Sequence, residues 1–178
     1  LVGALAGLWP WGDGAVNFHP DRRLFMLPQK PYVPSGTLRR AAAYPAAAED
    51  WTIEEIGEAL DKVGLGHLKD KIEEDAPWDQ TLSGGEKQRL AFARLFLHNP
   101  DIIVLDLNLP GLDGYSVLQQ LRSRPATRNI PVMVLTAKGD EDNEVRVFEL
   151  GADDFITKPF RARALSARLE AVLGRLRA

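Results

Sequence analysis

Apolar runs of strand length recur along the chain, and in its second half amphipathic helical patterns separate them. Strands that alternate with helices are typical of a parallel sheet, because each right-handed crossover packs a helix on one face of the sheet. The runs are apolar throughout, as in strands that are buried on both faces. We therefore predict an α/β fold, a three-layer sandwich with a mainly parallel sheet. The predicted strands lie, in sheet order, at Arg23–Leu27, Ile102–Leu105, Val132–Leu135 and Asp154–Thr157, with an antiparallel strand added at 15–18 and helices at Tyr115–Arg122, Glu141–Leu150 and Phe160–Leu176.

Helical signals also occupy the middle of the first half. Thr52 and Glu55 form a capping-box pattern, in which two side chains satisfy each other's backbone N–H groups at the start of a helix. Ser83 and Glu86 repeat the pattern at a second helix start. We expect a small helical insertion at about 46–80. An exposed apolar surface on this insertion would favour a homodimer or disorder.

Composition narrows the function classes. The chain has 178 residues, of which 45% are hydrophobic and 26% charged, a profile that excludes a disordered or collagen-like protein. Lys and Arg number 22 against 25 Asp and Glu, so we expect no nucleic-acid partner. The apolar opening at 1–9 is too short to cross a membrane, and we expect no membrane partner. The absence of Cys excludes disulfides and thiolate metal sites, and we expect a soluble, cytoplasmic setting for the recombinant protein.

One short motif has the composition of an anion site. Residues 82–89, LSGGEKQR, combine a Ser, two adjacent Gly and a helix start. Small residues let a phosphate approach backbone N–H groups, and the N-terminal end of a helix favours negative charge. The candidate binding residues are Ser83, Gly84, Gly85 and Glu86. In the simpler alternative, Ser83 only caps a helix that packs on the sheet.

The surroundings of this motif resemble the ABC transporter ATPases. LSGGEKQRLAFARLFLHNPDIIVLD is similar to their signature motif, helix and Walker B strand, and LPQKPYVPSGTLR to their Q-loop segment. The likeness covers about residues 1–106 and extends to bacterial transporters related to the peroxisomal fatty-acid exporters. The resemblance implies that Gln29 senses metal and nucleotide, that Ser83, Gly84 and Gly85 contact a γ-phosphate held by a partner subunit, and that Asp106 is the Walker B aspartate.

Three departures from that family pattern argue against ATP hydrolysis. The 178 residues contain no GxxxxGK[ST], the loop whose N–H groups and Lys hold phosphates. Leu107 stands where the family has its catalytic Glu, and no His follows His98 to serve as the switch residue. We therefore expect that the chain is not an enzyme. An ABC-type ATP-binding fragment is the alternative.

From about residue 99 to the last residue, the chain resembles the receiver domain of two-component response regulators. PDIIVLDLNLPGLDGYSVLQQLR and VMVLTAKGDEDNEVRVFELGADDFITKPF carry this resemblance. It implies phosphoryl transfer to a carboxylate, with a divalent cation and hydrogen-bond donors around the phosphoryl oxygens. The implied roles are phosphoacceptor for Asp106, metal ligands for Asp106 and the Asn108 carbonyl, hydroxyl donor for Thr136, cationic contact for Lys158 and aromatic switch for Phe155, with a cis peptide at Lys158–Pro159.

A receiver also holds Mg²⁺ with an acidic pair at the end of its first strand. The corresponding strand end here is Leu27, Pro28, Gln29 and Lys30, with no carboxylate. Mg²⁺ prefers octahedral oxygen ligation, so one Asp and one carbonyl should bind it weakly. We expect no resident cofactor, and at most weak binding of Mg²⁺, phosphate or sulfate. A remnant site without turnover and a site phosphorylated on Asp106 both stay open.

The two resemblances meet inside one apolar segment, NPDIIVLD. A natural fusion joins whole domains through a linker, whereas this join replaces half of each fold. Our hypothesis is an engineered chimera, a designed or de novo protein that tests the recombination of P-loop NTPase and flavodoxin-like folds without native catalytic activity. A residual phosphorelay receiver and an ABC-type fragment are the alternatives. The predicted organisation is a single hybrid domain at 1–178, with a transporter-derived half at 1–105 and a receiver-derived half at 106–178.

Overall fold

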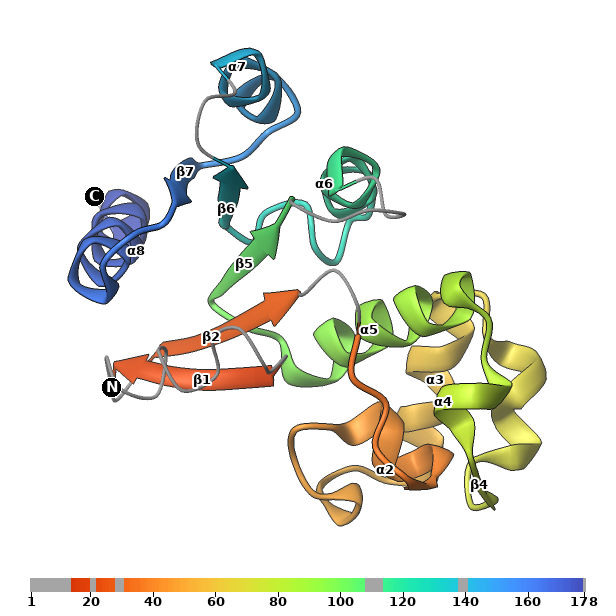
Figure 1. The fold of residues 1–178 in the computed structure, drawn as a ribbon. Helices are drawn as coiled ribbons and strands as arrows, with labels where there is room; N and C mark the ends of the chain where they lie inside the picture. The colour runs from red at the N-terminus through yellow and green to blue at the C-terminus, as the bar shows by residue number, and fades with distance from the viewer. Residues whose placement is uncertain (1–13, 20–21, 28–30, 108–113, 138–140, 178) are drawn as a thin grey trace. The chain divides into compact units, whose positions relative to one another are not determined.

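The computed structural model describes residues 14–19, 22–27, 31–107, 114–137 and 141–177 (Figure 1). Its main sheet has the strand order β1-β2-β5-β6-β7. The last four strands of this order are parallel, and β1 pairs with β2 in the antiparallel sense. The predicted strand order and directions are therefore confirmed. The strands are β1 Gly14–His19, β2 Arg22–Leu27, β5 Ile102–Asp106, β6 Val132–Ala137 and β7 Asp154–Lys158.

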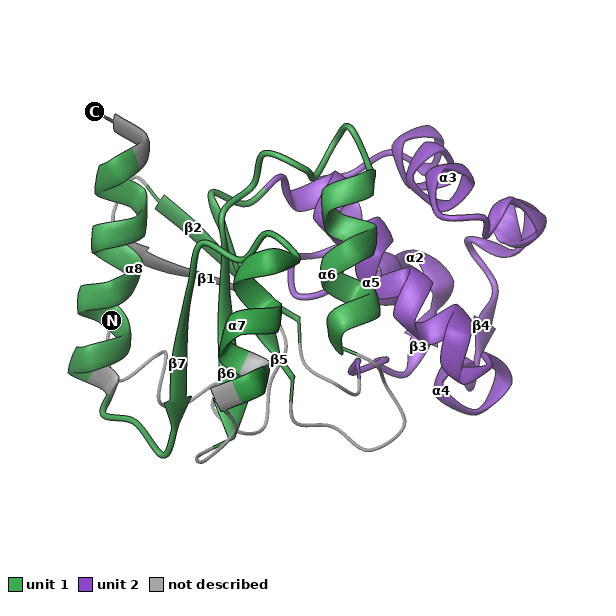
Figure 2. Ribbon diagram, turned by 90° about the horizontal axis from the view of Figure 1, so that it is seen from above, with its two compact units in different colours: residues 1–29, 100–178 green, residues 30–99 purple. Residues whose placement is uncertain are grey.

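The chain divides into two compact units (Figure 2). One, the sheet unit, comprises residues 1–29 and 100–178, and the other, the helical unit, comprises residues 30–99. The helical unit is longer than the insertion predicted at 46–80, because the segment before α2 and the long helix α5 belong to it. The single-domain organisation stays a prediction. The elements of the helical unit are β3 Gly36–Thr37, α2 Leu38–Ala43, η1 Ala48–Asp50, α3 Ile53–Lys62, η2 Gly66–Lys71, β4 Asp75–Ala76, α4 Trp78–Thr81 and α5 Gly84–His98.

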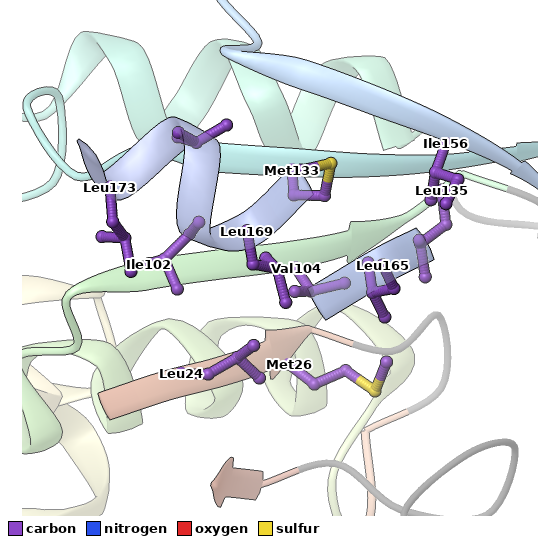
Figure 3. Packing of buried hydrophobic residues seen from close by; sticks show 11 residues of the cluster. Leu24, Met26, Ile102, Val104, Met133, Leu135, Ile156, Leu165, Leu169 and Leu173 are labelled. Atoms are coloured by element: carbon purple, nitrogen blue, oxygen red, sulfur yellow. The ribbon is translucent and has the colours of Figure 1, made fainter. Parts of the chain in front are cut away.

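One face of the main sheet is covered by α8, Ala162–Arg177. Alternate residues of the strands point to this face, since successive side chains of a strand alternate. Figure 3 shows apolar side chains of α8 and of the four parallel strands gathered in one cluster. The strand β2 of the transporter-like part thus shares an apolar layer with receiver-like elements. The buried members of the cluster are Leu24, Met26, Ile102, Val104, Met133, Leu135, Ile156, Leu165, Leu169, Val172 and Leu173.

The other face of the sheet carries the second apolar layer. Helix α6, Gly114–Ser123, contacts β5, and helix α7, Glu141–Glu149, contacts β6 and β7 (Figure 1). Together with α8, these helices make the predicted three-layer α/β arrangement. The buried residues that alternate onto this second face are Phe25, Leu27, Ile103, Leu105, Val132 and Val134, and the buried helix residues include Val117, Leu118, Leu121 and Val147.

Polar contacts run through the interior of the helical unit. The buried Arg94 of α5 donates from Nε to the Ala41 carbonyl at 3.0 Å and from a terminal nitrogen to the Tyr32 carbonyl at 2.7 Å. The buried His98 donates from Nε2 to the Ala43 carbonyl at 3.0 Å. The buried guanidinium and imidazole groups thus find acceptors in backbone carbonyl groups. They join α5 to α2 and to the segment before it.

None of the helices in the described ranges has the length and apolar character that a bilayer crossing requires. The apolar opening at 1–9 lies outside the described residues.

Candidate phosphoacceptor site and signature helix

The carboxyl ends of three neighbouring parallel strands bring the predicted phosphoacceptor residues to one edge of the sheet. Asp106 ends β5, and Lys158 ends β7. The Lys158 Nζ donates to Asp106 Oδ2 at 2.5 Å, and both side chains are largely buried, with 30% and 15% of their surface exposed. This ion pair crosses over β6, which separates the two strands. The structure thus brings these two side chains together.

Thr136 lies near the end of β6, between the strands that supply the ion pair. Its side chain is buried, and its Oγ1 is 3.4 Å from the Oγ1 of Thr157 on β7. The two threonines are direct partners in the β6–β7 register. Sequence reasoning missed Thr157. The signal that could have found it is the matching position of the two threonines before the ends of adjacent strands.

Phe155 lies near the start of β7, and its ring packs against α7 instead of the ion pair. The ring is in an edge-to-face arrangement with Phe148, at 5.4 Å between centroids. The Lys158–Pro159 peptide bond is cis, as predicted.

No group of three or more His, Cys, Asp or Glu side chains within the described ranges could hold a metal ion. The Asp106 carboxylate is paired with the Lys158 ammonium, whose charge opposes a cation beside it. Gln29 and Asn108 lie outside the described residues. The expectation of at most weak Mg²⁺ binding stays a prediction.

The second candidate site lies at the start of α5. Ser83 caps this helix: its Oγ accepts from the Glu86 N–H at 3.1 Å, and its own N–H donates to Glu86 Oε1 at 3.0 Å. The predicted capping box is therefore confirmed. Among the described residues, and apart from chain neighbours and the backbone of α5 itself, no atom lies within 4 Å of the position that a Cβ on Gly84 or Gly85 would occupy, so the backbone there is open to a ligand.

An additional residue, His67, contacts the capping box. Its Nε2 lies 3.3 Å from Glu86 Oε2. The hydrogen bond from the Ser83 N–H is the main cause that lowers the pKa of Glu86, and His67 contributes to the same direction. Sequence reasoning missed this contact because His67 lies on η2, 19 residues before Glu86.

Two families match the chain over partly overlapping ranges. A family model described as ABC transporter matches residues 10–107, and a family model described as response regulator receiver domain matches residues 79–170. Each match covers more than half of the chain. The chain belongs to both families. The ranges overlap at 79–107, which includes α5 and β5, so this helix–strand segment fits the pattern of either family.

Individual relatives match one part each. An uncharacterized ABC transporter ATP-binding protein of Haemophilus influenzae is 44% identical over 126 residues, which cover 67% of this chain and 21% of that protein. The phosphate regulon transcriptional regulatory protein PhoB of Pseudomonas aeruginosa is 48% identical over 90 residues, which cover 51% of this chain and 39% of that protein. The crystal structure of a putative response regulator from Chloroflexus aurantiacus matches 47% of this chain and 69% of that chain, with 36% identity and a TM-score of 0.45. The chain thus spans a minor part of the length of the curated relatives.

The comparison corrects the prediction that the chain is not an enzyme. The ABC transporter match and the ABC transporter ATP-binding relative point toward an ATP-hydrolysing protein, although the match is partial. That prediction depended on the absence of GxxxxGK[ST] and on Leu107.

Proposed function

We propose that the chain is a receiver-type phosphoryl acceptor built on a hybrid sheet, with Asp106 as the acceptor. The observation that carries this proposal is the 2.5 Å contact from Lys158 Nζ to Asp106 Oδ2 across β6. The receiver match at 79–170 and the likeness to PhoB support it. A carboxylate at the carboxyl end of a parallel sheet lies where such sheets bind ligands.

The reaction is a transfer from an acyl phosphate. A carboxylate oxygen of Asp106 forms a bond to phosphorus, the bond from phosphorus to the acyl oxygen breaks, and the leaving group departs as a carboxylate. No proton has to move in this step. The Lys158 ammonium and the Thr136 hydroxyl lie at the same edge and can stabilise negative charge on the phosphoryl oxygens. We also expect free phosphate or sulfate to bind weakly beside Lys158.

Intact-mass measurement tests the acceptor. The chain is incubated with acetyl phosphate, with Mg²⁺ in one sample and EDTA in the other. In the sample with Mg²⁺ we expect the mass gain of a single phosphoryl group. Asp106→Asn should abolish this gain, and Asp101→Asn should retain it. Asp101 precedes the opposite end of β5, where it pairs with Arg22, and is a matched control for loss of a carboxylate. No gain in the unaltered chain would contradict the proposal.

A second candidate function is ATP binding through the signature helix. The match at 10–107 and the open backbone at Gly84 favour it. The resemblance implies that Ser83, Gly84 and Gly85 contact the phosphates of the nucleotide. ATP should raise the melting temperature, and Gly84→Asp should remove the effect by charge repulsion, whereas Gly174→Asp on α8, also in open space, should retain it. An unchanged melting temperature at millimolar ATP would contradict this candidate.

The origin that we propose is deliberate recombination inside β5. The support is the position of the join, since both families require an apolar strand there and the overlap of the two matches contains it. A natural gene that carried the same join in frame would contradict a deliberate origin. We also propose that the chain forms a homodimer, which sedimentation at increasing concentration would detect. We further propose a cytoplasmic setting and no nucleic-acid partner.

A further inference from the structure

Two threonine hydroxyls face each other beside the ion pair. Thr136 and Thr157 are paired residues of β6 and β7, with 3.4 Å between their Oγ1 atoms. Thr136 is 1% exposed and Thr157 is half-buried. Thr157 donates to, or accepts from, the hydroxyl that the receiver pattern assigns to phosphoryl binding.

The two pairs of side chains lie on opposite faces of the same sheet edge. Asp106 continues the alternation of Ile102 and Val104, and Lys158 that of Ile156, so both belong to the face covered by α8. Thr136 and Thr157 alternate onto the other face. A phosphoryl group on Asp106 has several oxygens, so Lys158 on one face and Thr136 on the other can each contact one of them. Thr157 acts on this group only through Thr136.

A hydroxyl has one proton to donate and lone pairs to accept with. If Thr136 donates to a phosphoryl oxygen, its own oxygen is buried and gains from a donor behind it. The Thr157 hydroxyl is at hydrogen-bond distance to be that donor. Without it, the Thr136 side chain loses the contact that fixes the direction of its O–H bond.

We propose that Thr157 is a positioning residue that orients the Thr136 hydroxyl toward a phosphoryl group on Asp106. This inference rests on the proposed acceptor function. The role requires the hydroxyl of residue 157 and not its shape. Thr157→Val preserves the branched shape and removes the hydroxyl, whereas Thr157→Ser retains the hydroxyl.

Two measurements on the same variants test the proposal. The first is the rate of phosphoryl gain from acetyl phosphate, which Thr157→Val should slow about three- to tenfold and Thr157→Ser should restore to nearly the original value. The second is the χ1 rotamer of Thr136 from three-bond NMR couplings, which should be single in the unaltered chain and averaged in Thr157→Val. Thr127→Val is the matched control, because it removes a buried hydroxyl that donates to the Leu121 carbonyl. It should lower stability and leave both the rate and the Thr136 rotamer unchanged.

The outcomes separate the two proposals. A phosphoryl gain that is equally fast in the unaltered chain and in folded Thr157→Val overturns the role of Thr157 alone. Slowing in Thr157→Ser equal to that in Thr157→Val also overturns it. No phosphoryl gain in the unaltered chain overturns the acceptor function, and with it the role of Thr157 in phosphoryl binding. Slowing in Thr157→Val with an averaged Thr136 rotamer supports both.

Discussion

The two compact units differ in the polar side chains that they bury: Arg94 and His98 in the helical unit, Thr127 and Thr136 in the sheet unit. In the sheet unit, the buried cluster beneath α8 consists of Leu, Ile, Val and Met side chains. In the helical unit, the buried Arg94 and His98 donate to backbone carbonyl groups. An apolar layer requires volume and strand register, whereas each polar contact requires a specific partner. The difference predicts which parts of a fold can be exchanged between families.

The family matches follow this difference. The helical unit, residues 30–99, lies wholly within the ABC transporter match at 10–107. The apolar cluster draws Leu24 from that match and Leu169 from residues matched only by the receiver family. The apolar layer combines residues of both matches. In the polar network, the acceptors Tyr32, Ala41 and Ala43 lie in the ABC transporter match alone, whereas the donors Arg94 and His98 lie in the overlap of the two matches.

Removing the buried guanidinium should break the helical unit most severely. Arg94→Ala removes the hydrogen bonds to the Ala41 and Tyr32 carbonyl groups and the packing against Tyr44, so we expect a loss of about 4 kcal/mol in unfolding free energy. Urea unfolding followed by circular dichroism measures the change. The exposed Arg89 on the same helix is the control, and Arg89→Ala should change stability by less than about 0.5 kcal/mol. Equal effects of the two variants would remove the distinction between the units.

A cavity in the apolar layer should have the next largest effect. Leu169 of α8 is fully buried in the cluster, and Leu169→Ala should cost about 3 kcal/mol through lost burial and the remaining cavity. The same unfolding experiment measures it. Glu170→Ala, an exposed change at the next position, should be nearly neutral. A small effect of Leu169→Ala would show that α8 does not pack on the sheet.

A swap that conserves volume should be tolerated in the same layer. Met133 is fully buried on β6, and Met133→Leu should cost less than about 1.5 kcal/mol, because the layer requires volume more than shape. Thermal unfolding with unchanged cooperativity is the expected result. Failure of this variant to fold would indicate that the apolar layer is as specific as the polar network.

The smallest effect concerns the charge of the capping box. The pKa of Glu86 is lowered from its ordinary value of 4.5, chiefly by the Ser83 N–H, so the folded state favours the charged form. The stabilisation is therefore present above pH 4.5 and is lost as the pH falls through the folded pKa. Glu86→Gln retains an oxygen for the Ser83 N–H and should cost roughly 0.5 kcal/mol near neutral pH, with the difference disappearing in acid. A difference that stays constant with pH would contradict this origin.

The features of the fold that depend on local pattern could be predicted from the sequence. The alternation of strand-length apolar runs with helical segments along the chain predicted the order of β2, β5, β6 and β7. The spacing of Ser83 and Glu86 predicted the start of α5. The same reasoning missed the partners of Arg94, because those partners are carbonyl groups 53 and 62 residues away. The contacts of His67 with Glu86 and of Thr157 with Thr136 were also missed, because each joins side chains of two different elements. Side-chain pairing across elements depends on packing, which a single sequence does not display.

Native-state hydrogen exchange across the β2–β5 pair tests the central claim most directly. The backbone of Leu24–Leu27 pairs in parallel register with Ile102–Leu105, which joins a transporter-like strand to the strand that both families match. If the sheet is one cooperative unit, the amides of β2 and β6 should open with the same free energy as those of β5. Exchange of β2 amides at a much lower opening free energy, with β5 to β7 still protected, would contradict a single sheet shared by two families.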